Sequence, residues 1–560
     1  FAEGSRGELF VLDYDYTGQI YELLPSGLAD TSAEFPRRLS QTGLFVAGDD
    51  GRFSPRGELK PAAGVVGYDV IAKRWMDGAE ADRYVAIPNV GKILLASDNS
   101  KRASYPDGTV FVKHLSLPSS NRSSRLETQV LHFEHDRWNA YAYLWNAAGT
   151  DAELVAPDGA DLPLQIKNQS GTITEHTWHT STVNECRLCH NAGSGFVLGF
   201  VPNQLRMNAN SGIIAGASTI GEDDPSRLID PHDATQSLND RARSYLHANC
   251  SMCHHPGGNA IVSFYLRREL PFHELRTNKS TGIGTFGMRN AKLIVPGDPY
   301  RSVLMYRMSK LGYSRMPYIG SRVIDSAGVK LIHDWIRAMP RTATSDDSAP
   351  IRPNTAEAEA LSLLAKATST QQQRNAAIQK LTESSEGSLA LVMPIHAARK
   401  GNGPPIRNAD QTTVQQGYQS SRTDIRGLFE TFIPEAKRRA TLGPNIKPET
   451  ILSLSGKVDR GKLIFFSDGA RCRICHDVND ANKSTGPTLG EIAKKYPRRS
   501  ELLQHVLQPS LKVDDKFATY VVVTTKGRVL TGLLAKQTES EVTLRVPNDT
   551  RLVSIKRAEI

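Results

Sequence analysis

The sequence lacks any long uninterrupted hydrophobic run. Of its 560 residues, 39% are hydrophobic and 23% are charged. No stretch approaches the roughly 20 apolar residues needed to span a bilayer, so a membrane-spanning protein is not expected. The composition also has none of the biases of collagen, coiled coils or disordered chains. At roughly 100–200 residues per domain, the length predicts about three to five domains, each with its own core.

A leader segment is also missing. The chain begins at Phe1, with no initiator Met and no basic and apolar segment of the kind that directs export. We therefore expect a processed or partial chain whose export signal lies outside this sequence.

Several enzyme signatures are absent as well. No dinucleotide fingerprint, phosphate loop, nucleophile triad or pair of catalytic carboxylates stands out, so no catalytic residue is predicted. The net charge of +9 arises in Thr431–Ile560, where Lys and Arg outnumber Asp and Glu by 9. A short basic cluster within it, Lys494, Lys495, Arg498 and Arg499, has no nucleic-acid-binding motif around it. A solvated basic face is favoured, and no nucleic-acid partner is expected.

Cysteine is scarce, but its placement is distinctive. The six cysteines form three Cys-x-x-Cys-His segments, and none is left over. This is the attachment signature of c-type haem: two thiols about one helical turn apart add to the two vinyl groups, and the next imidazole becomes an iron ligand. The sequence therefore predicts three covalent haems, held by Cys186, Cys189, Cys250, Cys253, Cys472 and Cys475, with His190, His254 and His476 as the proximal iron ligands.

Other uses of these cysteines fit the pattern less well. Disulfides would not require a His after every second Cys. Zinc sites would pair one Cys-x-x-Cys with another or with spaced His residues. A thioredoxin-type redox pair would be expected once, between a strand and a helix.

Because haem is attached outside the cytoplasm in bacteria, we expect a periplasmic or otherwise extracytoplasmic protein.

Hydrophobic periodicity separates β-rich stretches from helical ones. Two apolar runs around a Tyr-Thr-Gly turn predict a hairpin over 8–24, and strand-like segments over 60–165 predict an all-β, sandwich-like domain. A β pattern returns after Lys516. Helices are predicted at 238–246, 329–337, 356–367, 371–382 and 428–440. The fold class is thus multidomain α+β: a β-rich domain, two or more helical cytochrome c units and a small C-terminal antiparallel β unit.

Three parts of the chain resemble known families. The Glu-Leu-Phe-Val-Leu-Asp and Gly-Gln-Ile-Tyr runs within 8–24 are similar to the closing strands of a glucose/sorbosone dehydrogenase β-propeller. Residues 40–340 resemble a bacterial dihaem cytochrome c family, in Arg125-Leu-Glu-Thr, Trp145-Asn, Leu198-Gly-Phe, the stretch 241–258 and Met316-Pro317. Residues 425–560 resemble a cytochrome domain of planctomycete and verrucomicrobial proteins, in Leu428-Phe-Glu, Gly486-Pro487 and Leu507-x-Pro-Ser. Such a domain often follows a sugar-dehydrogenase-like propeller.

Pattern and resemblance together predict six successive regions. They are terminal strands of a β-propeller at 1–30, a β-rich domain at 40–165, a dihaem cytochrome c region at 170–340, a linker and helical spacer at 341–455, a third cytochrome c unit at 456–510 and a small antiparallel β unit at 515–560.

The second axial ligand of each iron, usually Met or His, sets its potential. For the second haem the candidate is Met316, in a Ser-Arg-Met-Pro stretch that precedes a predicted closing helix. For the first haem the alternatives stay open. They are His114, whose surroundings resemble a dihaem-family motif, then Met207, and finally His176, His179 or an open iron.

For the third haem the prediction comes from an absence. No Met follows Met393, and His505 is the only His after His476. The related domains continue into a Ser-x-Met-Pro stretch, which implies that the native chain extends beyond Ile560 and supplies a Met there. His505 is a weaker candidate.

These features predict a trihaem c-type cytochrome module that relays electrons to an external acceptor. The propeller resemblance implies a donor: a fused quinoprotein sugar or alcohol dehydrogenase, with pyrroloquinoline quinone on a missing N-terminal part. The expected partners are that fused domain or other redox proteins, and whether the whole protein is an enzyme stays open. The alternatives are a haem peroxidase with one open iron, and a redox-sensing binding module.

Overall fold

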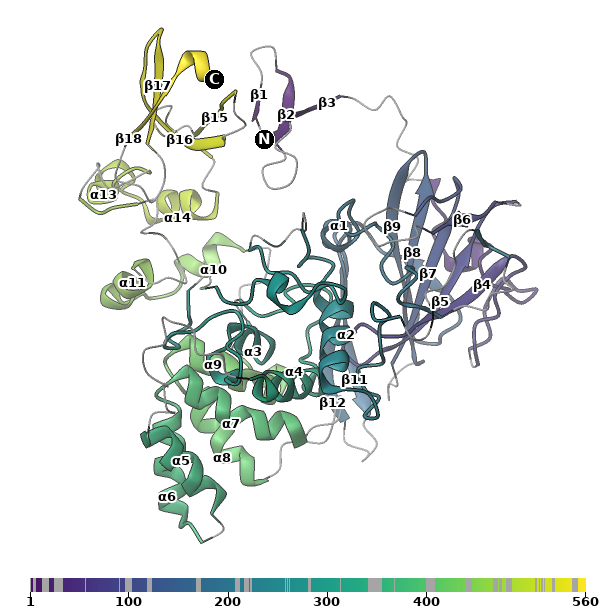
Figure 1. Ribbon diagram of the computed structural model, residues 1–560, viewed down its shortest axis with the longest axis horizontal. Coiled ribbons are helices and arrows are strands. Elements are labelled where there is room, and N and C mark those ends of the chain that lie inside the picture. Colours follow the sequence, from purple (N-terminus) through teal and green to yellow (C-terminus); the bar gives the residue numbers. More distant parts are fainter. Residues whose placement is uncertain are drawn as a thin grey trace. The chain divides into compact units, whose positions relative to one another are not determined.

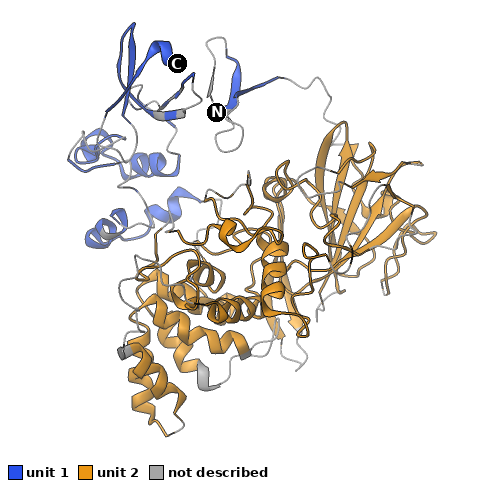
Figure 2. Cartoon of the chain, in the orientation of Figure 1, with its two compact units in different colours: residues 1–29, 439–560 blue, residues 30–438 orange. Residues whose placement is uncertain are grey.

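A computed structural model gives the fold of most of the chain. It describes residues 2–3, 7–12, 20–24, 34–55, 57–89, 91–95, 103–117, 123–167, 173–206, 212–215, 221, 224–256, 258, 260, 262–279, 284–312, 314–340, 355–366, 368–398, 408–439, 446–466, 472, 476–479, 486–508, 511–512, 514, 517, 519–525, 529–545 and 552–560. Contacts divide it into two compact units, 1–29 with 439–560 and 30–438 (Figure 2). The structure is mixed, with a large antiparallel sheet and several helices.

A seven-stranded antiparallel sheet dominates the unit 30–438 (Figure 1). In spatial order its strands are β10 (Ala152–Leu154), β9 (Arg137–Trp145), β8 (Arg125–Glu134), β7 (Val110–Ser116), β5 (Glu80–Ala86), β4 (Val65–Val70) and β13 (Leu205–Arg206). Two smaller pairings flank it, β11 (Ala160–Lys167) with β12 (Ile173–Thr180) and β6 (Ile93–Leu94) with β14 (Ile214–Ala215).

The β-rich domain expected as a sandwich contains this large sheet, and Leu164, Ile166 and Trp178 of the β11–β12 pair pack with Leu115 and Leu126 of the large sheet. Its face that carries Val112, Val130 and Trp145 is covered by Leu39, Leu44, Phe45, Phe53 and Leu59, from a segment whose regular structure is one short 3₁₀ helix, Leu39–Gln41. Alternation along a strand reports only that a face is buried. It does not distinguish a second sheet from a chain segment that covers the first.

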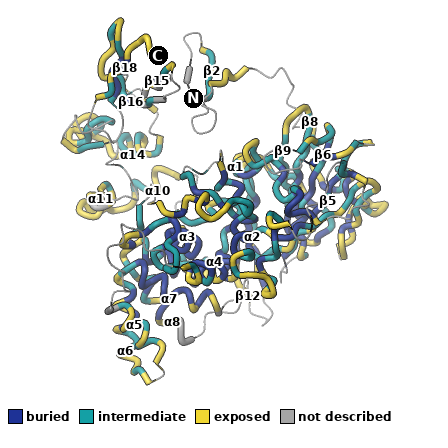
Figure 3. The backbone as a smooth tube through the Cα atoms, viewed as in Figure 1, coloured by how far each residue is buried: buried dark blue, intermediate teal, exposed yellow. Residues whose placement is uncertain are grey.

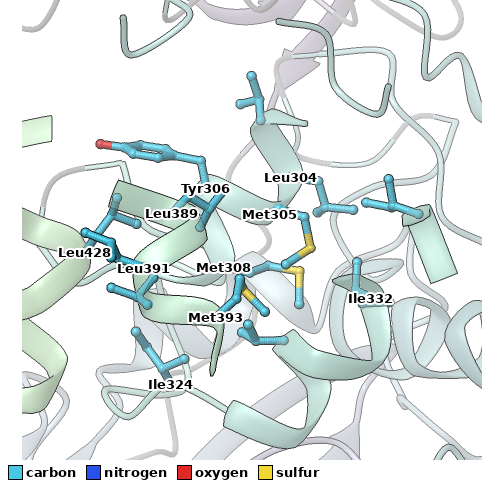
Figure 4. Packing of buried hydrophobic residues seen from close by; sticks show 14 of the residues in the cluster. Leu304, Met305, Tyr306, Met308, Ile324, Ile332, Leu389, Leu391, Met393 and Leu428 are labelled. Carbon is cyan, nitrogen blue, oxygen red and sulfur yellow. The ribbon is translucent and has the colours of Figure 1, made fainter. Parts of the chain in front are cut away.

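Helices form the second core of this unit. They are α1 (Val183–Cys189), α2 (Leu238–Cys250), α3 (Val303–Met308), α4 (Ser326–Ala338), α5 (Thr355–Ala365), α6 (Gln371–Leu381), α7 (Ser385–Ala398), α8 (Asn408–Tyr418) and α9 (Thr423–Phe429). Apolar side chains of α2, α3 and α4 pack with those of α7 and α9 in one buried cluster, part of which Figure 4 shows. The predicted helices at 238–246, 329–337, 356–367 and 371–382 correspond to α2, α4, α5 and α6.

Two expectations for 341–455 differ from the structure. The segment expected as a spacer contributes Leu389, Val392 and Phe429 to the same core as α2–α4. The helix expected over 428–440 ends at Phe429 and continues only as 3₁₀ turns, Glu430–Phe432 and Glu435–Lys437. Pro434 lies between those turns, and it cannot donate the backbone hydrogen bond that a continuous helix needs. Of the linker predicted at 341–355, the structure describes only Thr355, the first residue of α5.

The unit formed by 1–29 and 439–560 contains two small antiparallel sheets and short helices. One sheet is β1 (Ala2–Glu3), β2 (Leu9–Leu12) and β3 (Ile20–Leu23); the other is β15 (Thr519–Val523), β16 (Val529–Gln537), β17 (Glu541–Arg545) and β18 (Leu552–Lys556). The helices are α10 (Pro448–Leu452), α11 (Val458–Phe465), α13 (Ile492–Lys495) and α14 (Arg499–Leu507). The pairing of β2 with β3 confirms the hairpin predicted within 8–24.

Burial differs between the elements of the chain. Dark blue, buried stretches run through the large sheet and helices α2, α3, α4 and α7 in Figure 3, while α10, α11 and α14 are mostly yellow or teal. Among the described residues, no helix has the length and apolar character required to cross a bilayer.

Candidate functional site

The first Cys-x-x-Cys-His segment begins on a well-defined helix. Thr182 caps α1 by accepting a hydrogen bond from the Glu185 backbone, and the Glu185 side chain accepts one from Thr182 in return. Cys186 and Cys189 then lie about one turn apart, and the His190 backbone donates to the Cys186 carbonyl at 2.8 Å. The local sequence thus fixes both thiols and the following imidazole on one short helix.

All three histidines that follow the cysteine pairs are oriented in the same way. The Nδ1 atom of His190 lies 2.6 Å from the Phe196 carbonyl oxygen, that of His254 3.1 Å from the Phe264 carbonyl, and that of His476 2.9 Å from the Pro487 carbonyl. A carbonyl can only accept, so Nδ1 carries the proton in each ring. Within the described chain, the Nε2 atoms have no hydrogen-bond partner, which is how iron-ligating histidines are held.

Burial also keeps two of these imidazoles neutral. Desolvation lowers the pKa of His190 to about 4 and that of His254 to about 4, although the Phe196 and Phe264 carbonyls oppose the shift. Neutral imidazole is the form that binds metals. The donor sets in the unit 30–438 therefore fit a haem iron.

A cavity of about 170 Å³ adjoins the first segment. On one side it is lined by Cys186, Cys189 and His190, and on the other by residues of the large sheet. Gly199 and Met252 also contribute to its lining. The first candidate site is thus a hollow between α1 and the sheet.

Strand register explains the composition of the sheet wall. Tyr68 pairs with Arg83, Arg83 with Lys113, Lys113 with Gln129, and Gln129 with Ala142, so these residues form one row across β4, β5, β7, β8 and β9. Cross-strand partners project to the same face, and all five line the cavity. The small Ala142 side chain leaves room in this wall.

Two ionisable groups of this wall differ in exposure: Glu127 is 1% exposed, whereas Lys113 is partly buried. Glu127 accepts hydrogen bonds from Gln129, Trp178 and Thr180 at 2.8, 2.8 and 3.2 Å, yet burial raises its pKa. Burial lowers the pKa of Lys113 well below its ordinary value, and the Glu127 charge acts in the opposite direction. The cavity therefore holds a well-bonded carboxyl group and a desolvated amine.

The second segment starts at the end of α2, a helix capped by the Ser237 side chain, which accepts from the Asp240 backbone. Asn249, directly before Cys250, accepts a hydrogen bond from the Trp75 backbone at 2.8 Å. The loop between β4 and β5 is thereby tied to the second cysteine pair.

The first and second segments meet at their sulfur atoms. The Cys253 thiol lies 4.0 Å from the Leu188 carbonyl oxygen and donates a hydrogen bond to Cys189, which lowers the pKa of the Cys189 thiol and raises that of Cys253. Arg74 also hydrogen-bonds Cys189, and its charge acts on Cys250, Cys253 and His190. Two of the predicted attachment sites therefore adjoin, with one guanidinium beside them.

Met316 lies in a loop after α3 and is only half-buried. Its backbone donates to the Arg307 carbonyl at 2.9 Å, and the Arg307 charge acts on His254. Met305 and Met308, by contrast, belong to the buried helical core. The loop that follows is held by Asp77, which accepts from the backbones of Arg322 and Val323 at 2.8 to 2.9 Å.

Of the alternatives for the first iron, the structure does not bring His114 into the cavity. His114 alternates with Lys113 on β7, so it projects to the opposite face, where its Nδ1 lies 3.0 Å from the Thr128 hydroxyl and its ring packs on Trp145. Met207 lies outside the described residues. His176 lies 3.8 Å from Asp77, and His179 contacts Asp161 and Glu185 at 2.7 and 3.0 Å.

In the third segment the structure describes Cys472 and His476, while Cys475 lies outside the described residues. His505 packs its ring on Tyr496, with the centroids 4.3 Å apart. The described part of the chain shows no contact between His505 and His476. His255, which follows the second segment, is 3% exposed.

Sequence reasoning did not single out Lys113, Arg74 or Asp77. The signal for Lys113 was its alternation with Phe111 and Leu115, which places a lysine on a buried face of a central strand. Arg74 and Asp77 lie in a loop with no comparable pattern. Within the described residues, no group of three or more His, Cys, Asp or Glu side chains could hold a metal ion; a haem iron needs only one or two protein ligands.

Comparisons with known proteins give no assignment: no family model, no curated protein and no solved structure matches this chain.

Proposed function

We propose that this chain is a trihaem c-type cytochrome module for electron transfer. The observation that supports the proposal is the contact of Cys253 with Cys189 and with the Leu188 carbonyl, which brings two of the three Cys-x-x-Cys-His segments together. In each of the three segments, an imidazole donates Nδ1–H to a carbonyl and leaves Nε2 without a partner. Such paired placement suits a relay, in which the cofactors carry the electrons and the protein fixes their spacing and surroundings.

The residues of the chain have distinct roles in this proposal. Cys186, Cys189, Cys250, Cys253, Cys472 and Cys475 would form the thioethers, and His190, His254 and His476 would ligate iron. A bound haem iron supplies one-electron chemistry by cycling between ferrous and ferric states. Arg74 places a positive charge beside the first two segments, which favours the reduced, less positive state of both irons.

The donor and the compartment are parts of the same proposal. Covalent haem attachment supports an extracytoplasmic location. The β2–β3 hairpin is compatible with the end of a propeller, which supports a fused quinoprotein dehydrogenase with pyrroloquinoline quinone as the donor. A separate redox protein is the alternative donor.

Haem stoichiometry and spin state test the proposal. Protein matured in a host with haem-attachment machinery should contain three covalent haems by the pyridine haemochrome assay, and reduction by a one-electron donor should be reversible. Fewer than three haems would contradict it. A high-spin iron together with peroxide turnover would instead favour the peroxidase, and binding of a partner that is lost on reduction would favour the sensing module.

A further inference from the structure

The first candidate site has an imidazole on one side of its cavity and a polar sheet wall on the other. His190 reaches the cavity from the end of α1, with its Nδ1 held by Phe196. The opposite wall carries the row from Tyr68 through Arg83, Lys113 and Gln129. This inference rests on the proposed function, because it asks which group of that wall would face a haem iron held by His190.

Most polar groups of the row are already engaged or chemically unsuited. Arg83 donates to Asp69 and to the Ala81 carbonyl at 3.3 and 3.1 Å, and a guanidinium has no lone pair to offer. Gln129 donates to Glu127, which also accepts from Trp178 and Thr180. Burial raises the pKa of Tyr68, so its phenol keeps its proton.

Lys113 differs from these neighbours. Its ammonium group forms no hydrogen bond and no ion pair with the described residues, although the side chain lines the cavity. It projects from β7, between β5 and β8, and the side chain lines the cavity while remaining partly buried. Its charge also acts on the His190 ring, so the two groups lie within electrostatic range across one hollow. Among these wall residues, Lys113 therefore has no described partner, and after loss of its proton its amine can offer a lone pair to a group in the cavity.

Sulfur donors that line the same cavity are placed differently. Met76 packs among Leu115, Leu126 and Trp178 in an apolar cluster. Met252 lies between Cys250 and Cys253, so it belongs to the second segment and is 8% exposed. Neither projects from the sheet wall that faces His190.

We propose that Lys113 Nζ is the sixth ligand of the first haem iron. To bind, Lys113 would lose one proton to solvent and offer the freed lone pair to an iron that His190 Nε2 would also hold. The ligand is supplied by the central strand of a rigid sheet rather than by a loop. The pair at the first iron would then be His190 and Lys113, whereas Met316 is the candidate for the second iron.

The axial ligands can be identified by spectroscopy, without a measurement of enzyme turnover. Electron paramagnetic resonance and near-infrared magnetic circular dichroism of the oxidised wild-type protein should show one low-spin haem with a histidine–amine ligand pair. In Lys113→Leu, one of the three irons should become high-spin, and added methylamine should restore it to low spin. In Lys113→Met, that iron should gain a thioether signature and a higher midpoint potential. The control Arg83→Gln removes a cation one strand away and should leave all three spin states unchanged.

The outcomes separate this inference from the proposed function. Three covalent haems with unchanged spin states in Lys113→Leu would overturn the ligand assignment and leave the electron-transfer proposal intact. A shift in potential without a change of spin state would overturn it as well, because Lys113 would then act only through its charge. Fewer than three haems in the wild type would instead contradict the proposed function. If Lys113→Leu fails to fold, the spectra of the wild type and of Lys113→Met still test whether Lys113 is the ligand.

Discussion

The first two Cys-x-x-Cys-His segments and the third are built in contrasting ways. Cys189 is 5% exposed, and α2, which leads into Cys250, buries seven of its residues. In the unit that holds the third segment, α10, α13 and α14 bury none of their described residues. Val458 is 87% exposed and Val506 71%.

This contrast indicates where the protein itself supplies a core. The unit 30–438 has large apolar clusters of its own, so its first two sites form on a folded scaffold. Around the third segment, apolar side chains of α11 and α14 lack such a cluster among the described residues, and the small core of this unit belongs to the β15–β18 sheet. A large apolar cofactor would supply the missing contacts, since burial of apolar surface is the main favourable term in folding.

Removing the third haem should therefore have the largest effect. Replacing Cys472 and Cys475 by Ser should delete one haem and abolish the amide protection of α11 and α14 in hydrogen exchange, while β15–β18 stays protected. In the matched control, Ser at Cys186 and Cys189 should also delete one haem but leave β7 and β8 protected. Retained protection of α14 without its haem would break the comparison.

Replacing Met316 at the second site should change the spectrum and potential of one haem. Met316→Ala should abolish the weak red absorbance of a methionine–iron bond and lower the potential of one haem, because a thioether favours ferrous iron. Met305→Leu is a matched control, since this methionine is fully buried in the helical core and a volume-conserving replacement there costs less than about 1.5 kcal/mol. The same optical change in both variants would exclude Met316 as the ligand.

A smaller effect should mark Arg74, whose charge acts on both segments of the unit 30–438. Arg74→Gln should lower two of the three midpoint potentials in a redox titration, because loss of a nearby positive charge disfavours the reduced state. The third haem serves as the internal control. Equal shifts in all three potentials would contradict the placement of this residue.

The smallest effect concerns pH. Burial lowers the pKa of His247 on α2 to about 4, and its Nδ1 accepts a hydrogen bond from the Arg268 backbone at 3.0 Å. The folded state therefore binds fewer protons than the unfolded chain below about pH 6.5, so stability falls as pH decreases toward 4. Between pH 7 and 5 the loss is at most about 2 kcal/mol. Hydrogen exchange of α2, corrected for intrinsic rates, should show this loss in the wild type and not in His247→Asn.

Local features of the molecule were predictable from the sequence. The strands β5, β7 and β8, the helices α2 and α4, and the spacing of the cysteine pairs all follow from short-range patterns. What could not be predicted depends on contacts between distant segments. No periodic pattern in the sequence predicts that Cys189 approaches Cys253 or that Arg74 lies beside both. The same holds for the packing of α7 in the core of α2–α4.

His114 illustrates the same limit within a single strand. A β-strand alternates its side chains between two faces, so the adjacent Lys113 and His114 have opposite environments. Which of the two faces α1 depends on the side of the sheet that the helix covers.

The proximity of Cys189 and Cys253 also bears on how the protein would be assembled. The hydrogen bond from Cys253 lowers the pKa of the Cys189 thiol, which raises its share of thiolate, the form that attacks disulfides and oxidants. In an oxidising compartment, a bond between these two sulfurs would disable two attachment sites at once. During assembly, oxidation of these thiols would then compete with haem attachment. The chain would have to receive its haems before this region closes, or remain under a thiol reductant until it does.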